Sequence, residues 1–127
     1  MNTQYIELGN QGWYILVYYN ADYSDRDELY KALSFLDCPV STITKALKVL
    51  KRKNIGFTFT NSDYKMSIVC IGEASSRSQF VSTVVHEAKH VQSHICSFYD
   101  IDEDSEEAAY LIGYIAKRMY IGIINVY

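Results

Sequence analysis

The segment from Gln79 to Tyr99 constrains the fold most, because it predicts a long amphipathic helix. Ser76 or Ser78 can cap its N-terminus with a side-chain oxygen. Apolar side chains recur along it every three or four residues, which places them on one helix face; they are Phe80, Val84, Ala88, Val91, Ile95 and Phe98. A helix with such a stripe must pack against a sheet or against other helices.

Further strands and helices are predicted around this segment. Runs of β-branched and aromatic residues bounded by turn residues predict three strands, at 13–19, 56–60 and 64–72. Helical spacing predicts three more helices, within 25–37, within 41–54 and from about 105 to 120. The body of the last helix, AAYLIGYIA, is apolar all the way round and is expected to be buried. We therefore expect an α+β fold, with a small, mostly antiparallel sheet and helices packed on one side of it.

Length and composition set further bounds. The 127 residues match a single domain, 1–127, and the net charge of -3 argues against a protein that mainly binds nucleic acid. The three cysteines form no Cys-x-x-Cys pair, which favours a reducing compartment, and Cys70 and Cys96 are expected to be buried packing residues. The N-terminus lacks a signal-peptide pattern, and no apolar run has the length of a membrane helix. We expect a cytoplasmic protein with no membrane partner.

The residues that carry chemistry are concentrated in HEAKH, at 86–90 of the long helix. His86 and His90 are one helical turn apart, so both imidazoles can face one metal ion, and Glu87 can reach a metal-bound water. Taking about 100° per residue, the histidines lie roughly 130° from the centre of the apolar stripe, so they are not core residues. A third ligand can come from the first turn of the last helix, where Glu106 and Glu107 precede an apolar body.

HEAKH followed by SEEAAYLIG resembles the gluzincin metallopeptidases, in which H-E-x-x-H is followed on a second helix by the Glu of an E-x-x-A-[DNY] motif. The similarity is to compact gluzincins, including ImmA/IrrE-type proteins of phages and mobile elements, and covers about 65–120. It implies a zincin-like fold with Zn2+ between the last two helices, held by His86, His90 and Glu106, with Glu87 as general base. The implied activity is hydrolysis of a peptide or protein substrate by a zinc-activated water. Strand 65–72 would then be a sheet edge to which an extended substrate adds, and an ordinary core strand fits the same residues equally well.

Two glutamates compete for the third ligand position. Glu106 shares a helix stripe with Ala109 and Gly113, and these small residues would let the last helix approach the HEAKH helix closely, which favours Glu106 over Glu107. His94 is eight residues from His86 and is expected to be a surface or supporting residue. The residue that stabilises the oxyanion stays open among nearby candidates, which are Tyr99, Tyr110, Tyr114 and His94.

Two other functions are open at this stage. A catalytically inactive zincin-fold protein would bind metal without cleaving peptides and would act as an interaction or inhibitor protein. A winged-helix DNA-binding protein would use residues 27–71, with the basic helix within 41–54 reading DNA and the following hairpin as the wing. The acidic net charge argues against this last alternative.

Overall fold

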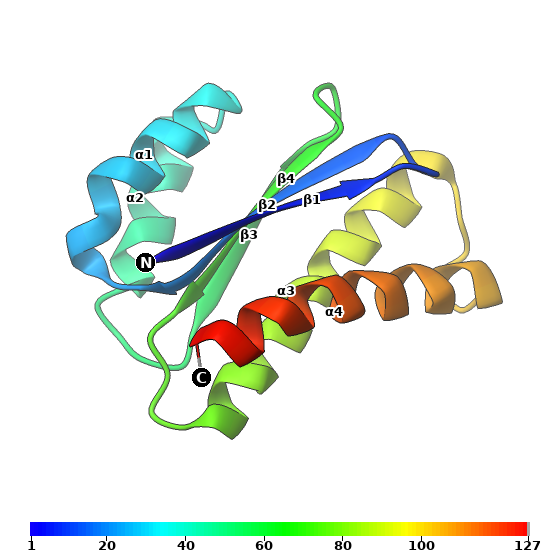
Figure 1. Ribbon diagram of the computed structural model, residues 1–127. Coiled ribbons are helices and arrows are strands. Elements are labelled where there is room, and N and C mark those ends of the chain that lie inside the picture. Colours follow the sequence, from blue (N-terminus) through cyan, green and yellow to red (C-terminus); the bar gives the residue numbers. More distant parts are fainter. Residues whose placement is uncertain (127) are drawn as a thin grey trace.

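Two β-hairpins build the sheet of the computed structural model, which describes residues 1–126 (Figure 1). The first consists of β1 (Asn2–Leu8) and β2 (Trp13–Ala21), and the second of β3 (Gly56–Asn61) and β4 (Met66–Gly72). β2 and β4 pair in parallel, so the strand order is β1-β2-β4-β3 and the sheet is mixed. β1 and β3 are therefore the edge strands.

The three predicted strands are present as β2, β3 and β4, but the sheet differs from the expectation in two ways. β1 was not predicted, because its polar sequence buries only Ile6 and Leu8. Of the two alternatives for 65–72, the sheet edge is wrong and the core strand is confirmed, because β4 lies inside the sheet between β2 and β3. Its residues from Ser67 to Gly72 are buried. The edge beside the HEAKH helix is β3.

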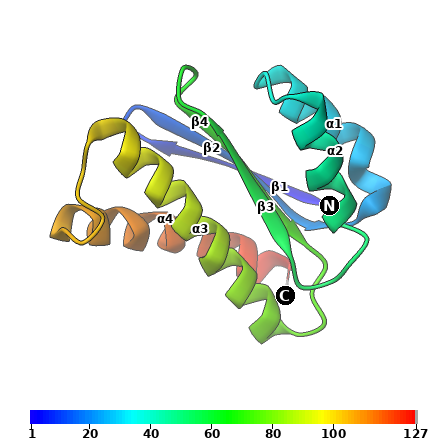
Figure 2. The ribbon, with the colours of Figure 1, turned by 180° about the vertical axis from the view of Figure 1, so that it is seen from behind.

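Helices cover both faces of the sheet (Figures 1 and 2). The short 3-10 helix η1 (Tyr23–Asp25) leads into α1 (Arg26–Phe35) and α2 (Val40–Val49) on one face, and α3 (Arg77–Tyr99) and α4 (Glu106–Val126) cover the other. The expectation of helices on one side only is therefore wrong. The sequence of β2 explains this, because it is apolar on both faces of the strand. Val17 packs towards α3 and α4, and Tyr18 packs towards α1 and α2.

α3 matches the predicted amphipathic helix closely. The side chain of Ser76 accepts a hydrogen bond from the backbone N–H of Gln79 (3.2 Å), which caps the N-terminus. Asp100 ends the helix in a left-handed conformation with φ of 56°. The predicted apolar stripe is buried except for Phe98, whose ring lies 5.5 Å from that of Trp13 between centroids.

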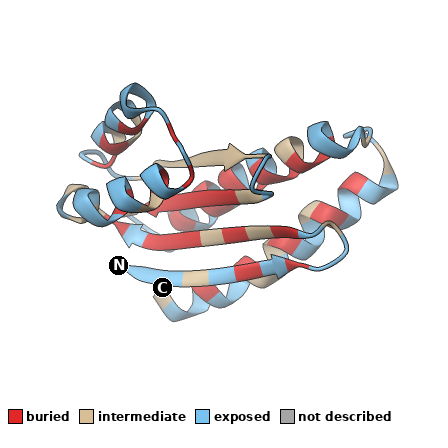
Figure 3. Ribbon diagram, turned by 90° about the horizontal axis from the view of Figure 1, so that it is seen from above, coloured by how far each residue is buried: buried red, intermediate tan, exposed pale blue. Residues whose placement is uncertain are grey.

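α4 is not buried all the way round, so this expectation is wrong. Figure 3 shows helices of this fold as alternating buried and exposed stretches, and in α4 the buried side is formed by Ala108, Leu111, Ile115 and Met119. Ala109 and Gly113 are exposed, and among residues 1–126 nothing beyond the chain neighbours of Gly113 and the nearby helix backbone lies within 4 Å of a Cβ built on Gly113. The larger apolar residues turn towards the core because they remove more apolar area from water. The small-residue stripe of Ala109 and Gly113 therefore does not pack against α3.

Other expectations concern the cysteines, the membrane and the hairpin. Cys70 and Cys96 are buried and free, as predicted, and burial raises the pKa of the Cys70 thiol above its ordinary value.

Within residues 1–126, no helix combines the length and apolar character that a membrane span requires. The β3–β4 hairpin, which the winged-helix hypothesis uses as a wing, forms half of the sheet and is covered by helices on both faces.

Candidate metal centre

One flank of α3 lies along the edge strand β3. Two side-chain hydrogen bonds link this flank to β3, between Glu87 and Thr58 and between His94 and Thr60. A third joins Thr83 to the backbone oxygen of Asn54, just before β3 begins. His90 and His86 lie about 60° and 100° around the helix from Glu87, on the side away from the core. Both histidines are exposed. The HEAKH residues therefore meet solvent beside a free edge of the sheet.

The two histidines converge as a pair. Nε2 of His86 and Nε2 of His90 lie 3.2 Å apart, and the ring planes are inclined at 76°. A zinc ion about 2.0–2.1 Å from each nitrogen would see them at an angle of roughly 100°, near the tetrahedral value. The pair thus fits two ligand positions of one divalent ion.

Glu87 lies beneath this pair and is held in place by β3. Its side chain is 4% exposed, and the hydroxyl of Thr58 donates a hydrogen bond of 2.9 Å to Oε1. The other oxygen, Oε2, lies 3.8 Å from Nε2 of His86. Gly56 also packs closely against the stem of this side chain, because a Cβ there would meet Glu87 Cγ at 3.3 Å. A buried carboxylate with one oxygen bound and the other towards an imidazole is placed to act as a base.

His94 ends a chain of hydrogen bonds that starts in the core. Nε1 of Trp13 donates to Oγ of Ser67 (3.1 Å), which lies 2.7 Å from Oγ1 of Thr60. Oγ1 of Thr60 in turn lies 2.7 Å from Nδ1 of His94. An indole N–H can only donate, so Trp13 is the donor to Ser67. When the chain runs from Trp13 to His94, the hydroxyl of Ser67 donates to Thr60 and the hydroxyl of Thr60 donates to Nδ1 of His94. In this direction Nδ1 of His94 is an acceptor and the ring hydrogen is on Nε2, whereas in the opposite direction Thr60 donates to Ser67 and accepts from Nδ1–H of His94.

The surroundings of His94 agree with a neutral ring. Partial burial lowers the pKa of His94 below its ordinary value, and the neighbouring His90 lowers it further. The rings of His90 and His94 are 6.3 Å apart between centroids. His94 therefore lies next to the histidine pair, and in the chain direction that starts at Trp13 its N–H is on the side of the ring away from Thr60.

The structure does not bring Glu106 to the histidine pair. α4 packs on α3 through Gln92, whose Nε2 donates to the carbonyl oxygen of Ala108 (3.1 Å). Gln92 lies about 160° around α3 from His90, so α4 lies on nearly the opposite flank. Across residues 1–126, no three or more His, Cys, Asp or Glu side chains are grouped so that they could hold a metal ion. Two predicted ligands and the predicted base are thus together, and the predicted third ligand is apart from them.

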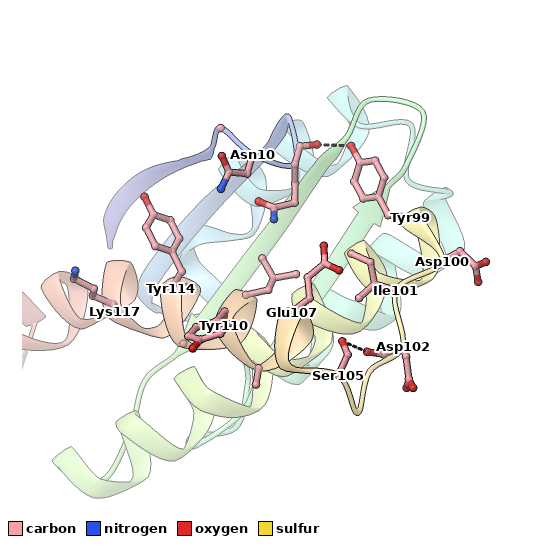
Figure 4. Close-up of a pocket in the computed structure, with 15 residues that line it drawn as sticks. Asn10, Tyr99, Asp100, Ile101, Asp102, Ser105, Glu107, Tyr110, Tyr114 and Lys117 are labelled. Atoms are coloured by element: carbon pink, nitrogen blue, oxygen red, sulfur yellow. Dashed lines mark hydrogen bonds between the residues drawn. The ribbon is translucent and has the colours of Figure 1, made fainter.

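Glu107 lies in a different place again, in a groove of about 1390 Å³ (Figure 4). The groove lies between the β1–β2 turn, the α3–α4 connection and α4. Tyr99, whose hydroxyl donates to the carbonyl oxygen of Gln11, forms part of its wall, as do Tyr114 and Lys117. No residue of HEAKH lines it. This concave surface is therefore separate from the candidate metal centre.

The strand residues that support the centre were not among the predicted site residues. Thr58 and Thr60 alternate with Phe57 and Phe59 in β3, and the phenylalanines pack towards α1 and α2. This alternation is a signal in the sequence, since side chains of a strand point to opposite faces in turn. It shows which residues share a face, but not that this face meets HEAKH.

Comparisons of the chain with protein-family models, with curated proteins and with solved structures found no match. The resemblance to gluzincins therefore rests on HEAKH and SEEAAYLIG. The geometry around His86, Glu87 and His90 carries the functional argument.

Proposed function

We propose that the chain is a zinc-dependent metallopeptidase in which His86 and His90 are metal ligands and Glu87 is the general base. One observation carries the proposal: two imidazole nitrogens 3.2 Å apart lie beside a buried carboxylate that a strand hydroxyl holds in place. When bound, zinc would supply an activated water and would polarise a carbonyl group. Both proposed ligands, His86 and His90, come from α3, and Glu106 is not proposed as a ligand.

Glu87 has the position that proton transfer requires. Thr58 occupies one carboxylate oxygen and leaves the second, on the side of His86, to accept a proton. Glu87 would take a proton from water beside the histidines and return it to the leaving amine. The bond from Thr58 fixes the direction of the carboxylate during both steps.

The edge strand β3 offers a binding site for an extended substrate. β3 pairs with β4 on one side only, so main-chain groups on its other side are free to pair with a peptide. Such a peptide would run beside the histidine pair. With its ring hydrogen on Nε2, His94 would be a donor on this flank that stabilises charge on a substrate oxygen.

A second candidate is a metal-binding zincin-like protein without peptidase activity. A catalytic zinc site ordinarily has three protein ligands and one open position. The observation that favours this candidate is that residues 1–126 bring together two histidines without a third ligand.

Cleavage of denatured casein and of a mixed peptide library by zinc-loaded protein tests the proposal. We expect cleavage by the wild type and by the control Ser82→Ala, which changes an exposed residue of the same helix. Glu87→Gln keeps an oxygen for Thr58 but removes the base, so the rate should fall by about 100-fold or more. Cleavage by Glu87→Gln at the wild-type rate would overturn the mechanism. Bound zinc without cleavage by the wild type would favour the second candidate.

A further inference from the structure

Ser67 is a polar side chain inside the core, in the central strand β4. It is 0% exposed. Side chains two residues apart in a strand share a face, so Ser67 lies on the same face of β4 as Val69 and Ile71, which pack in the core beneath α3 and α4. A hydroxyl in such surroundings needs partners within the protein, because water does not reach it. The partners of Ser67 therefore determine where its hydrogen points.

Ser67 has two hydrogen-bond partners within residues 1–126. Its Oγ lies 3.1 Å from Nε1 of Trp13 and 2.7 Å from Oγ1 of Thr60. Trp13 can only donate, so it cannot accept the hydroxyl hydrogen of Ser67. Thr60 is the acceptor that remains for this hydrogen.

The opposite direction of the chain leaves a buried hydrogen without an acceptor. If Thr60 donated to Ser67, the oxygen of Ser67 would accept from both Trp13 and Thr60, and its own hydrogen would have no partner. A buried donor without an acceptor is unfavourable, because it has given up its bond to water. The direction that starts at Trp13 gives every hydrogen of the chain an acceptor and is therefore favoured.

This direction fixes the hydrogen of the His94 ring. Thr60 accepts from Ser67, so its own hydrogen is donated to Nδ1 of His94, which lies 2.7 Å away. A neutral imidazole carries one ring hydrogen, and this hydrogen is then on Nε2. Nε2 of His94 has no hydrogen-bond partner within residues 1–126, and the ring is half-buried beside His90. Its N–H is thus available to a ligand on this flank of α3.

We propose that Ser67 is a positioning residue that holds His94 in the form with its hydrogen on Nε2. Ser67 acts through Thr60, which lies between the two in the chain. The consequence for catalysis rests on the proposed function. With the hydrogen on Nε2, His94 donates to a carbonyl oxygen of a peptide substrate, whereas with the hydrogen on Nδ1 it does not. The chemical group that fits this position is an oxygen acceptor, not a donor such as an ammonium group.

Nitrogen-15 NMR of the metal-free protein, at a pH above the ordinary imidazole range, tests the proposal through the ratio of the two neutral forms of His94. The variant His94→Gln identifies the signals of this ring. In the wild type we expect the Nε2–H form to exceed the Nδ1–H form by about tenfold or more, because the alternative leaves a buried hydrogen unpaired. Ser67→Ala removes the donor to Thr60, so this ratio should fall by about threefold or more. Ser67→Thr keeps a hydroxyl and should keep the wild-type ratio.

A control variant separates the hydroxyl of Ser67 from the packing around it. Phe98→Leu changes the packing against the ring of Trp13 but removes no group of the chain, so the ratio should stay as in the wild type. Circular dichroism checks that each variant is folded. A wild type in the Nδ1–H form would overturn the proposal without any variant. A ratio in Ser67→Ala equal to that of the wild type would also overturn it, since Ser67 would then not set the tautomer.

Peptide cleavage gives a second readout for the same variants. We expect kcat of Ser67→Ala to fall in proportion to the fraction of the Nε2–H form, with KM unchanged, because the donor acts on charge that develops in the transition state. An unchanged kcat in a variant whose tautomer ratio has shifted would overturn the catalytic consequence. The NMR result on metal-free protein does not depend on cleavage. Failure of the proposed function and failure of this inference are therefore distinguishable.

Discussion

Single residues of β3 fix the chemistry of α3 side chains at two positions. Thr58 holds the carboxylate of Glu87, and Thr60 connects His94 to the buried pair of Ser67 and Trp13. Both hydroxyls direct a polar group that would otherwise be free to rotate or to change its tautomer. The order of the candidate centre therefore depends on a strand that is far from α3 in sequence.

The first prediction concerns the tautomer of His94. With Thr60 as donor to Nδ1, the ring hydrogen is on Nε2. Thr60→Val removes this donor, so Nδ1 can carry the hydrogen and the ring should populate both tautomers. Nitrogen-15 NMR at a pH above the ordinary imidazole range would show a single Nε2–H form in the wild type and a mixture in the variant. An Nδ1–H form in the wild type would contradict the assigned direction of the chain.

The second prediction concerns the support of Glu87. Thr58→Val keeps the shape of the side chain but leaves a buried carboxylate without its hydroxyl donor. We expect the free energy of unfolding to fall by about 1–3 kcal/mol, measured by urea denaturation. Thr58→Ser keeps the hydroxyl and should recover most of this loss. Equal stability of Thr58→Val and the wild type would show that the bond contributes nothing.

At the scale of elements, the two sides of α4 differ in how tightly they are packed. On the buried side, a Cβ built on Gly122 would lie 2.2 Å from Cζ of Tyr19. The ring of Tyr19 cannot easily move, because its hydroxyl donates to Oε1 of Gln4 (2.6 Å) and the residue is 1% exposed. On the exposed side, Gly113 has open space around it.

The third prediction compares alanine at these two glycines. Gly122→Ala should destabilise the protein by about 1–3 kcal/mol, because the methyl group overpacks the interface with Tyr19. Gly113→Ala should stabilise it by about 0.5–1 kcal/mol, because alanine favours the helix and meets nothing. Urea denaturation of dilute protein measures both values. A stabilising Gly122→Ala together with a destabilising Gly113→Ala would contradict the packing, since Gly113 and not Gly122 would then face the core.

The rotation of α4 also explains why Glu106 was predicted as a ligand and is found apart from the histidines. Small residues at Ala109 and Gly113 suggested a close-packed stripe that contained Glu106. The helix instead buries the larger side chains of Leu111, Ile115 and Met119. Which side of α4 is buried depends on how much apolar area the whole helix can bury against the sheet and α3. The spacing of residues within α4 does not contain this information.

For the whole molecule, local patterns were predictable and long-range pairings were not. The apolar stripe of α3 and the position of HEAKH relative to it follow from helical spacing, so His86, Glu87 and His90 could be predicted together. The parallel pairing of β2 with β4 joins segments about 50 residues apart and has no local signal. The placing of α1 and α2 on the second face follows from that pairing.

The metal content of the purified protein tests the central claim most directly. Protein incubated with zinc and then dialysed would be measured by elemental mass spectrometry, with His90→Ala and Glu106→Ala prepared in the same way. The geometry of the histidine pair predicts about one zinc per chain in the wild type and in Glu106→Ala, and none in His90→Ala. A wild type without zinc, or an equal loss in Glu106→Ala and His90→Ala, would contradict a centre built on α3 alone.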